Sequence, residues 1–286
     1  MIKDFSDIDV LVFAGGGNRC FWQAGVITAF LDKSMALPKT LIGTSAGAAM
    51  AASCMTIGPE AALVNCTRLF ADNQRMFHWP AMARMKLHFA HQQTYPGWIA
   101  SIVNVDTFPM LKEGKQKLLV AVSRPARLLG KYGSIVAATL AYIVDKKIAH
   151  SIHPRLPRYL GLRQQFYDLQ NCDSAQAAQE LLNASAAAPP LTHPVLLDGT
   201  WALDGGYMDN APIPHQTAEE QARTLVLLTR HYPSRPELFQ HNGRTYWQPS
   251  RNIPVSTWDC TENSTVKAAF DLGYADARRR LNSQAA

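Results

Sequence analysis

Two short apolar segments, each ending in small residues, constrain the fold of this chain more than any other feature. Residues 9–17 read DVLVFAGGG and residues 40–44 read TLIGT, and both are apolar enough to be strands buried on both faces. Between them, FWQAGVITAFLDKSM (21–35) repeats apolar residues at steps of three and four, which predicts a helix. A strand, a helix and a strand in this order form the right-handed crossover of a parallel sheet. We therefore expect an α/β fold.

Later segments fit the same class. VLLDGTWALD (195–204) has two apolar runs around Asp198-Gly199, which predicts a hairpin. RTLVLLT (223–229) predicts another strand and STVKAAFDLGYADARRRL (264–281) a closing helix. Residues 60–165 mix Met, aromatic, His and Arg residues without this rhythm, and we expect them to be mostly helical. No linker stands out, so residues 1–286 are expected to form one domain.

Composition argues against several classes of protein. The first residues, MIKDFSDIDVLVF, lack the features of a signal peptide. The best candidate for a membrane span, SIVAATLAYIV (134–144), is shorter than the roughly 18 apolar residues that a spanning helix needs. Five cysteines without CxxC spacing argue against a disulfide framework and a zinc site. We expect a reducing, cytoplasmic location.

The net charge of +6 is concentrated in one segment. Residues 112–163 contain eleven lysines and arginines against two acids, Glu113 and Asp145, so this segment alone carries +9. Such a run is either a solvated helical face or a surface that meets phosphate, on lipid or on nucleic acid. No zinc-finger, RRM or KH pattern accompanies the charge, which disfavours nucleic acid as a partner.

A serine flanked by glycines follows the second predicted strand. GTSAG (43–47) places Gly43 and Gly47 two positions either side of Ser45, and the small residues AGAAMAAS (46–53) follow. Glycines at these positions let neighbouring backbones approach a strained turn from strand to helix, which exposes a nucleophilic hydroxyl. Ser45 is therefore a candidate nucleophile, at the edge where open α/β sheets bind ligands. A small residue in a tight loop is the alternative.

The glycines after the first strand are a candidate anion site. Gly15, Gly16 and Gly17 lead into a helix and present unhindered backbone N–H groups, so we predict them as oxyanion-hole donors. A dinucleotide-binding GxGxxG does not fit, because its third glycine would fall at Cys20. Nothing near Cys20 would activate a thiolate, and a packed thiol is expected. A tight turn without function is the alternative for the glycines.

The base that would activate Ser45 has several candidates. Asp204 ends the predicted hairpin, and the glycines behind it would let Ser45 approach closely, so it is a candidate for direct proton transfer. A serine triad would instead use a histidine after Asp204, for which the chain offers His215, His231 and His241. Asp209 and Asn210 are expected to secure the same loop by turn hydrogen bonds. Asp198 is expected to be only the turn residue of the hairpin.

Four motifs, taken in order, resemble those of the patatin-like phospholipases. They are GGGNR (15–19), GTSAG (43–47), ASAAAP (184–189) and DGGYMDNAP (204–212). The resemblance runs from about residue 9 to 215 and is loose over 60–165. It implies a three-layer α/β/α fold with a mainly parallel central sheet, and an enzyme that hydrolyses lipid esters without a cofactor. One departure is Cys20, where the family usually has glycine.

The resemblance also implies roles for individual residues. Ser45 would attack the ester carbonyl, Asp204 would accept its proton without a histidine, and the amides of Gly15 to Gly17 would hold the oxyanion. Arg19 matches the family's basic residue and would brace the glycine loop. Gly205 and Gly206, beside Asp204, would permit its contact with Ser45. The substrate would be a phospholipid or another lipid ester.

For such a substrate, residues 60–165 are expected to be a lid or an acyl-binding region. Met and aromatic residues between 76 and 110 would form an apolar groove, and the basic segment 112–163 would contact an anionic membrane. His88 and His91 lack a third ligand at a suitable spacing, so no metal is expected. Two other functions stay open: an α/β-hydrolase-like esterase with a Ser-Asp-His triad, and a lipid-binding module without catalysis.

Overall fold

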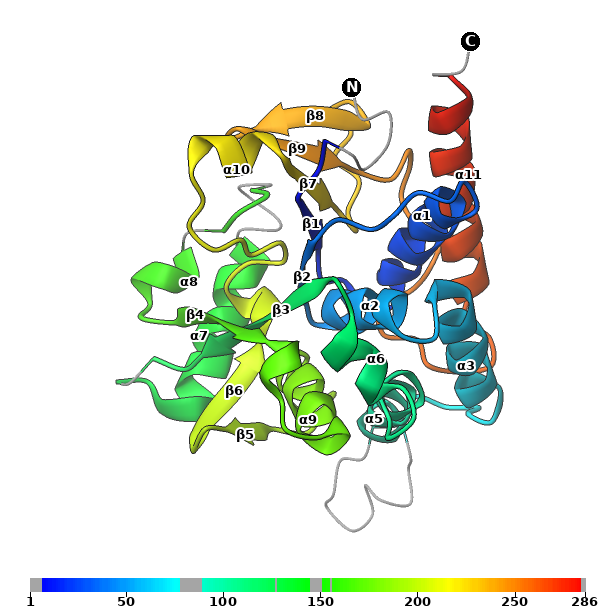
Figure 1. Ribbon diagram of the computed structural model, residues 1–286. Helices are drawn as coiled ribbons and strands as arrows, with labels where there is room; N and C mark the ends of the chain where they lie inside the picture. The colour runs from blue at the N-terminus through cyan, green and yellow to red at the C-terminus, as the bar shows by residue number, and fades with distance from the viewer. Residues whose placement is uncertain (1–6, 78–88, 127, 145–150, 155, 284–286) are drawn as a thin grey trace.

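The computed structural model describes residues 7–77, 89–126, 128–144, 151–154 and 156–283. Within these residues a nine-stranded mixed sheet runs in the order β5-β6-β3-β2-β1-β7-β9-β8, and β4 pairs with β3 (Figure 1). The strands are β1 (Val10–Phe13), β2 (Thr40–Thr44), β3 (Lys117–Arg124), β4 (Arg163–Asp168), β5 (Val195–Leu197), β6 (Thr200–Asp204), β7 (Thr224–Leu227), β8 (Leu238–His241) and β9 (Arg244–Trp247). The helices are α1 (Phe21–Leu31), α2 (Ala46–Met55), α3 (Pro59–Ala71), α5 (His91–Ile102), α6 (Phe108–Glu113), α7 (Gly130–Val144), α8 (Leu156–Tyr159), α9 (Ala175–Ser185), α10 (Ala218–Ala222) and α11 (Val266–Asn282).

The centre of the sheet is parallel and its margins are antiparallel. β1 pairs in parallel with β2 and β7, and parallel pairing continues from β2 to β3 and from β7 to β9. β4, β5, β6 and β8 run antiparallel to their neighbours. The predicted crossover is confirmed as β1, α1 and β2, with Val10 opposite Thr40. The predicted hairpin is confirmed as β5 and β6, joined by Asp198 and Gly199.

Alternate residues of the central strands build two cores. Leu11 and Phe13 of β1 face the large core that includes side chains of α1, α2, α3 and α11. Val12 and Ala14 face the other way, against Ile152 and other buried side chains. In Figure 1, α1, α2, α3 and α11 gather on one side of the sheet, and α7, α8 and α10 lie on the other. The expected three-layer α/β/α architecture with a mainly parallel centre is therefore confirmed.

Helix α1 is buried on every side rather than along one stripe. The sequence predicted a helix over 21–35, but α1 ends at Leu31, which is exposed. The other ten residues of α1 are buried because α11 covers the side away from the sheet. The backbones nearly touch at Gly273, where a Cβ would lie 1.9 Å from the carbonyl oxygen of Trp22. Trp22 Nε1 also donates to the buried carboxylate of Asp276 at 2.8 Å.

The region 60–165 contains strands as well as the expected helices. It supplies α3, α5, α6, α7 and α8, but also β3 and β4. β3 (KLLVAVSR) is a core strand with a largely buried sequence, paired in parallel with β2. The region is therefore not one continuous helical insertion, because β3 pairs with β2, the strand that directly precedes Ser45. None of the helices in the described ranges is long and apolar enough to cross a membrane.

Candidate active site

Ser45 occupies a sharp turn between β2 and α2. Its φ of 54° and ψ of −133° are unfavourable for a residue with a Cβ atom, as expected for a nucleophile on a strained turn from strand to helix. Both flanking glycines are required by close contacts. A Cβ on Gly43 would lie 2.4 Å from Ala48 Cα, and a Cβ on Gly47 would lie 2.5 Å from the carbonyl oxygen of Phe13. The turn holds the Ser45 side chain at the carboxyl edge of the sheet.

Asp204 contacts Ser45 directly. Ser45 Oγ donates a hydrogen bond to Asp204 Oδ2 at 2.7 Å, although 159 positions separate the two residues in the sequence. Asp204 ends β6, which pairs with β3, and there it lies opposite Val122. Its second carboxylate oxygen, Oδ1, accepts the backbone N–H of Gly206 at 2.7 Å. The carboxylate is therefore held from two sides, with one oxygen on the serine hydroxyl.

Two further serines hold this pair in place, and neither was assigned a role from the sequence. The Ser45 backbone N–H donates to Ser185 Oγ at 2.9 Å, and Ser185 Oγ donates to the Ala121 carbonyl at 2.6 Å. Ser123 Oγ donates to the Gly205 carbonyl at 3.0 Å. Ser185 is the last residue of α9, within ASAAAP, so that motif was the available signal. Both serines connect the site to β3.

The buried position of Asp204 changes its basicity. Burial raises the pKa of Asp204 from its ordinary value of 3.8 to about 6, and the hydrogen bonds from Ser45 and Gly206 oppose this rise. A carboxylate with a raised pKa binds a proton more strongly, so it is a better acceptor for the proton of a serine hydroxyl. At neutral pH the group is still mostly ionised, as a base must be.

Activity is expected to depend on the ionisation of Asp204. Only the carboxylate accepts a proton, so kcat/KM on a neutral soluble ester is expected to be full above the Asp204 pKa of about 6 and to fall below it. The fall approaches tenfold per pH unit, or about 100-fold at pH 4. The measurement is a profile of kcat/KM between about pH 4 and pH 8, with folding checked at each pH. A profile that stays flat down to about pH 4 would contradict an essential base with a raised pKa.

The contacts of the glycine loop change the assignment of Gly15 as an oxyanion donor. The backbone N–H of Gly15 donates to the Asn210 carbonyl at 2.7 Å, so this N–H already serves the loop and the expectation of three free donors is corrected. Gly16 and Gly17 line a cavity together with Ser45. Arg19 Nε donates to the Gly16 carbonyl at 3.2 Å, which is the bracing contact expected of this arginine.

The loop after Asp204 is tied to a histidine that the sequence did not indicate. Asp209 Oδ1 accepts the Ala211 N–H at 2.9 Å, as expected of a turn residue. Asp209 Oδ2 lies 2.6 Å from His153 Nδ1, and His153 Nε2 lies 2.6 Å from Tyr246 Oη. Because Asn210 in turn holds Gly15, this cluster fixes the position of the glycine loop.

The remaining candidates for a nucleophile or a base lie elsewhere. Cys20 is buried and donates to the Ala14 carbonyl at 3.5 Å, and burial raises the pKa of its thiol, as expected of a packed cysteine. Of the three histidines, His215 is exposed, His231 Nδ1 lies 2.8 Å from the Pro249 carbonyl, and His241 stacks on His153. Their contacts give no support to a histidine triad.

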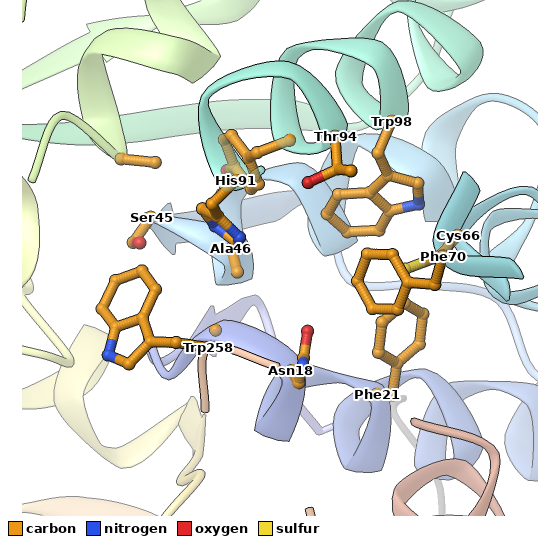
Figure 2. Close-up of a pocket in the computed structure, with 13 residues that line it drawn as sticks. Asn18, Phe21, Ser45, Ala46, Cys66, Phe70, His91, Thr94, Trp98 and Trp258 are labelled. Atoms are coloured by element: carbon orange, nitrogen blue, oxygen red, sulfur yellow. The ribbon is translucent and has the colours of Figure 1, made fainter. Parts of the chain in front are cut away.

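A narrow aromatic cavity of about 30 Å³ opens beside Ser45. Figure 2 shows Ser45 and Trp258 at one end of it and Phe21, Phe70 and Trp98 at the other. The apolar groove was expected from residues 76–110, and α5 does supply part of this lining through His91, Thr94, Tyr95 and Trp98. The walls from α1, α3 and the segment at Trp258 were not foreseen, because residues so distant in sequence meet only in the folded chain.

A second, larger cavity of about 460 Å³ also reaches the pair. Ser45 and Asp204 lie in its lining with Gly16, Gly17, Arg19, Thr139, Pro189, Tyr207, Asn210 and Trp258 among others. Thr139 comes from α7, so this helix borders the opening that leads to the candidate nucleophile. The site is therefore reached through a cavity with both polar and apolar walls.

The structure offers no assembled metal site in the ranges it describes. His88 lies outside the described residues. His91 is buried and stacks on Tyr95 with 5.6 Å between ring centroids, and burial lowers its pKa to about 4, so its ring is neutral at pH 7. His91 is therefore a neutral side chain in the wall of the aromatic cavity.

Comparison with known proteins identifies the family. The sequence matches the family model of patatin-like phospholipases over residues 11–215, which includes the glycine loop, Ser45 and Asp204. The chain belongs to the patatin-like phospholipase family. The resemblance inferred from the motifs is thereby confirmed. In this patatin-like chain, the strands β7, β8 and β9 and the helices α10 and α11 lie beyond the matched residues.

Comparisons with individual proteins add less. A search of the curated proteins found no match to this patatin-like chain. Nine chains of solved structures match it. One is VipD from Legionella pneumophila, with 12% sequence identity, a TM-score of 0.49, and coverage of 97% of this chain and 67% of that chain.

Proposed function

We propose that this chain is a lipid acyl hydrolase of the phospholipase A type, which cleaves fatty acyl esters with Ser45 and Asp204 and without a cofactor. Membership of the patatin-like phospholipase family supports hydrolysis of lipid esters in general. The observation that carries the specific assignment is the 2.7 Å hydrogen bond from Ser45 Oγ to Asp204 Oδ2. It supplies the contact through which a nucleophile and its base exchange a proton.

In the proposed reaction, Ser45 Oγ attacks the ester carbonyl carbon while its proton passes to Asp204 Oδ2. The tetrahedral intermediate collapses, the alcohol leaves with the proton from Asp204, and the acyl group remains on Ser45. Water then attacks this acyl ester and gives a proton to Asp204, which returns it to Ser45 as the fatty acid is released. Asp204 therefore acts as base and as acid in each half of the cycle.

The oxyanion is proposed to bind the backbone N–H groups of Gly16 and Gly17, with the N–H of Ala46 at the first position of α2. Gly16 and Gly17 border the cavity that contains Ser45, and Ala46 borders the aromatic cavity. The residue after a nucleophile on such a turn supplies an N–H in enzymes of similar geometry, and a helix N-terminus carries partial positive charge. Gly15 is not included because its N–H is bound to Asn210.

The two cavities suggest how an ester is held. The aromatic walls at Phe21, Phe70 and Trp98 suit the apolar surface of an acyl chain, and the space between them, about 30 Å³, must widen for the chain to enter. The larger cavity, with Arg19 and Asn210 in its lining, suits the polar part of a lipid ester. Part of the region 60–165 therefore serves as an acyl-binding region in this proposal.

A cytoplasmic enzyme that contacts anionic membranes peripherally completes the proposal. All five cysteines are free, which suits a reducing compartment. Not all of the basic segment 112–163 is available to a membrane. Arg124 is buried and donates to the Leu197 and Thr200 carbonyls, and Lys117 pairs with Asp168 at 3.0 Å. Six of the other nine basic residues fall between 127 and 158 in the sequence.

The test is fatty acid release from phospholipid vesicles and hydrolysis of a short-chain chromogenic ester, combined with labelling by a fluorophosphonate. Wild type is expected to hydrolyse both substrates, and the label is expected on the peptide that contains Ser45, because the reagent modifies activated serines. A folded wild type that neither hydrolyses an ester nor takes up the label would favour the lipid-binding module.

A further inference from the structure

Helix α7 carries a stripe of exposed apolar side chains. Tyr132, Val136, Leu140 and Val144 lie four residues apart on one face of the helix, and their exposed fractions are 75%, 60%, 59% and 41%. Apolar residues at this spacing normally face the core of a protein. These four, named here the α7 stripe, face solvent instead.

Neighbouring residues enlarge this apolar surface. Leu128 and Leu129 precede α7 and are exposed, and Leu156, Tyr159 and Leu160 are exposed at or beside α8. α7 packs against α8, and Figure 1 shows the two helices together at one end of the molecule. Nine of the fifteen exposed large apolar residues in the described chain lie between 128 and 160. Such a concentration of exposed apolar side chains marks an interaction surface.

The opposite side of α7 belongs to the catalytic region. Ile135 and Ala138 pack with Leu203, which directly precedes Asp204, and with Tyr207 and Met208 after it. Thr139 lines the larger cavity, in which Ser45 and Asp204 lie. One face of α7 therefore borders the opening of the site while the α7 stripe points outward beside it.

The sequence that contains α7 and α8 is basic. Residues 127–158 contain six lysines and arginines and one acid, Asp145. An apolar helix face within a basic sequence is the combination that binds at the interface of anionic bilayers, where apolar side chains enter the headgroup region and cations meet lipid phosphates. With fifteen residues, α7 suits a position along the membrane surface rather than across it.

We propose that the α7 stripe inserts into the surface of an anionic bilayer and thereby places the opening of the larger cavity against the lipid. The biological purpose of this contact, which is access to a lipid ester, rests on the proposed function. Membrane binding itself does not require that the chain hydrolyses an ester. It predicts that binding to vesicles and hydrolysis of soluble esters are separable properties of this chain.

The experiment compares Val136→Gln/Leu140→Gln with the control Val64→Gln/Val105→Gln. The control residues are exposed valines, one in α3 and one after α5. The control variant therefore replaces the same number of exposed apolar side chains at a distance in sequence from α7. Glutamine is a good helix former, which keeps α7 intact. Binding is measured by co-sedimentation with vesicles of phosphatidylcholine and phosphatidylglycerol, in a Ser45→Ala background so that no lipid is consumed. Hydrolysis of vesicles and of a short-chain soluble ester is measured with Ser45 present.

The stripe variant is expected to bind vesicles at least about tenfold more weakly than the control, because two apolar side chains no longer leave water. Its hydrolysis of vesicles should fall with binding, while kcat/KM on the soluble ester stays unchanged. Wild-type-like vesicle binding by the stripe variant would overturn the proposal. So would a wild type that forms a dimer through this face and ignores vesicles. If no ester is hydrolysed but the stripe variant alone loses vesicle binding, the proposed function fails and this inference stands.

Discussion

Replacing Asp204 with Asn is expected to reduce kcat by about 1000-fold or more, close to the effect of Ser45→Ala. Asparagine keeps the size of the side chain and a group that can lie against Ser45 Oγ, but an amide does not accept the hydroxyl proton. The carboxylate is held at 2.7 Å from Ser45 Oγ with its other oxygen on the Gly206 N–H, so the catalytic loss would reflect the missing base. The measurement is the turnover of a short-chain ester by wild type, Asp204→Asn and Ser45→Ala.

The stability of Asp204→Asn separates a catalytic loss from a damaged fold. Burial raises the pKa of Asp204 from 3.8 to about 6, so the ionised group destabilises the folded chain at neutral pH. Because the pKa is raised, this cost is absent below about pH 4 and complete above the folded pKa, where it is about 3 kcal/mol. Removing the buried charge should therefore leave the unfolding temperature at pH 7 equal to or above that of wild type. A variant that is inactive and unfolds at lower temperature would not support the assignment of Asp204 as base.

A histidine variant supplies the matched control for the dyad. His215, His231 and His241 are the three histidines that a triad could use, and their contacts lie away from Ser45. The triple alanine variant is expected to keep most of the wild-type turnover. If this variant stays folded and loses as much activity as Ser45→Ala, the enzyme uses a triad and the Ser45–Asp204 mechanism is wrong.

Replacing Gly17 with Ala is expected to lower kcat by about 100-fold, the effect of losing one oxyanion donor. Gly17 has a φ of 56°, and a Cβ there would lie 2.3 Å from the backbone carbonyl oxygen of Thr257. The added methyl group must therefore displace the glycine loop or the segment that covers it. Because Gly16 and Gly17 line the cavity at Ser45 and are the proposed oxyanion donors, the displacement should weaken binding of the transition state more than binding of the ester.

Gly58→Ala is the control for this substitution. Gly58 also has a positive φ, 87°, but a Cβ there would meet nothing within 4 Å, and it precedes α3 rather than the candidate site. Both variants experience backbone strain, while only Gly17→Ala disturbs the loop proposed to bind the oxyanion. The readouts are kcat and KM on a soluble ester together with the unfolding temperature. Equal kcat values for the two folded variants would contradict the role of Gly17 in the oxyanion site.

The local signals in the sequence were reliable where a short motif requires one geometry. GTSAG required a turn that brings backbones close at Gly43 and Gly47, and Ser45 lies on such a turn. The strand before it was predicted with the bounds that β2 has, because a short apolar run that ends in small residues has few alternatives. The pairing of Asp198-Gly199 with two apolar runs likewise required the hairpin that ends at Asp204.

Signals that depend on distant partners were weaker or misleading. The apolar repeats of α1 predicted a helix, but they did not show that α11 covers its outer side and makes it a core helix. KLLVAVSR was not recognised as a strand because the charged and aromatic residues around it obscured its apolar run, yet it became β3 once β2 and β6 were available to pair with it. The three glycines looked equivalent in sequence, and only the fold brings Asn210 to the N–H of Gly15.

The sequence by itself determined the family, the α/β class and the identity of the two residues proposed to react. These depend on local backbone requirements, which a few consecutive residues express. Only the tertiary structure decided that Ser45 Oγ reaches Asp204 Oδ2, that Ser185 and Ser123 hold the pair, and that the α7 stripe lies beside the opening of the site. Such contacts join residues far apart in the chain, and their distances follow from how the sheet orders its strands and buries its cores.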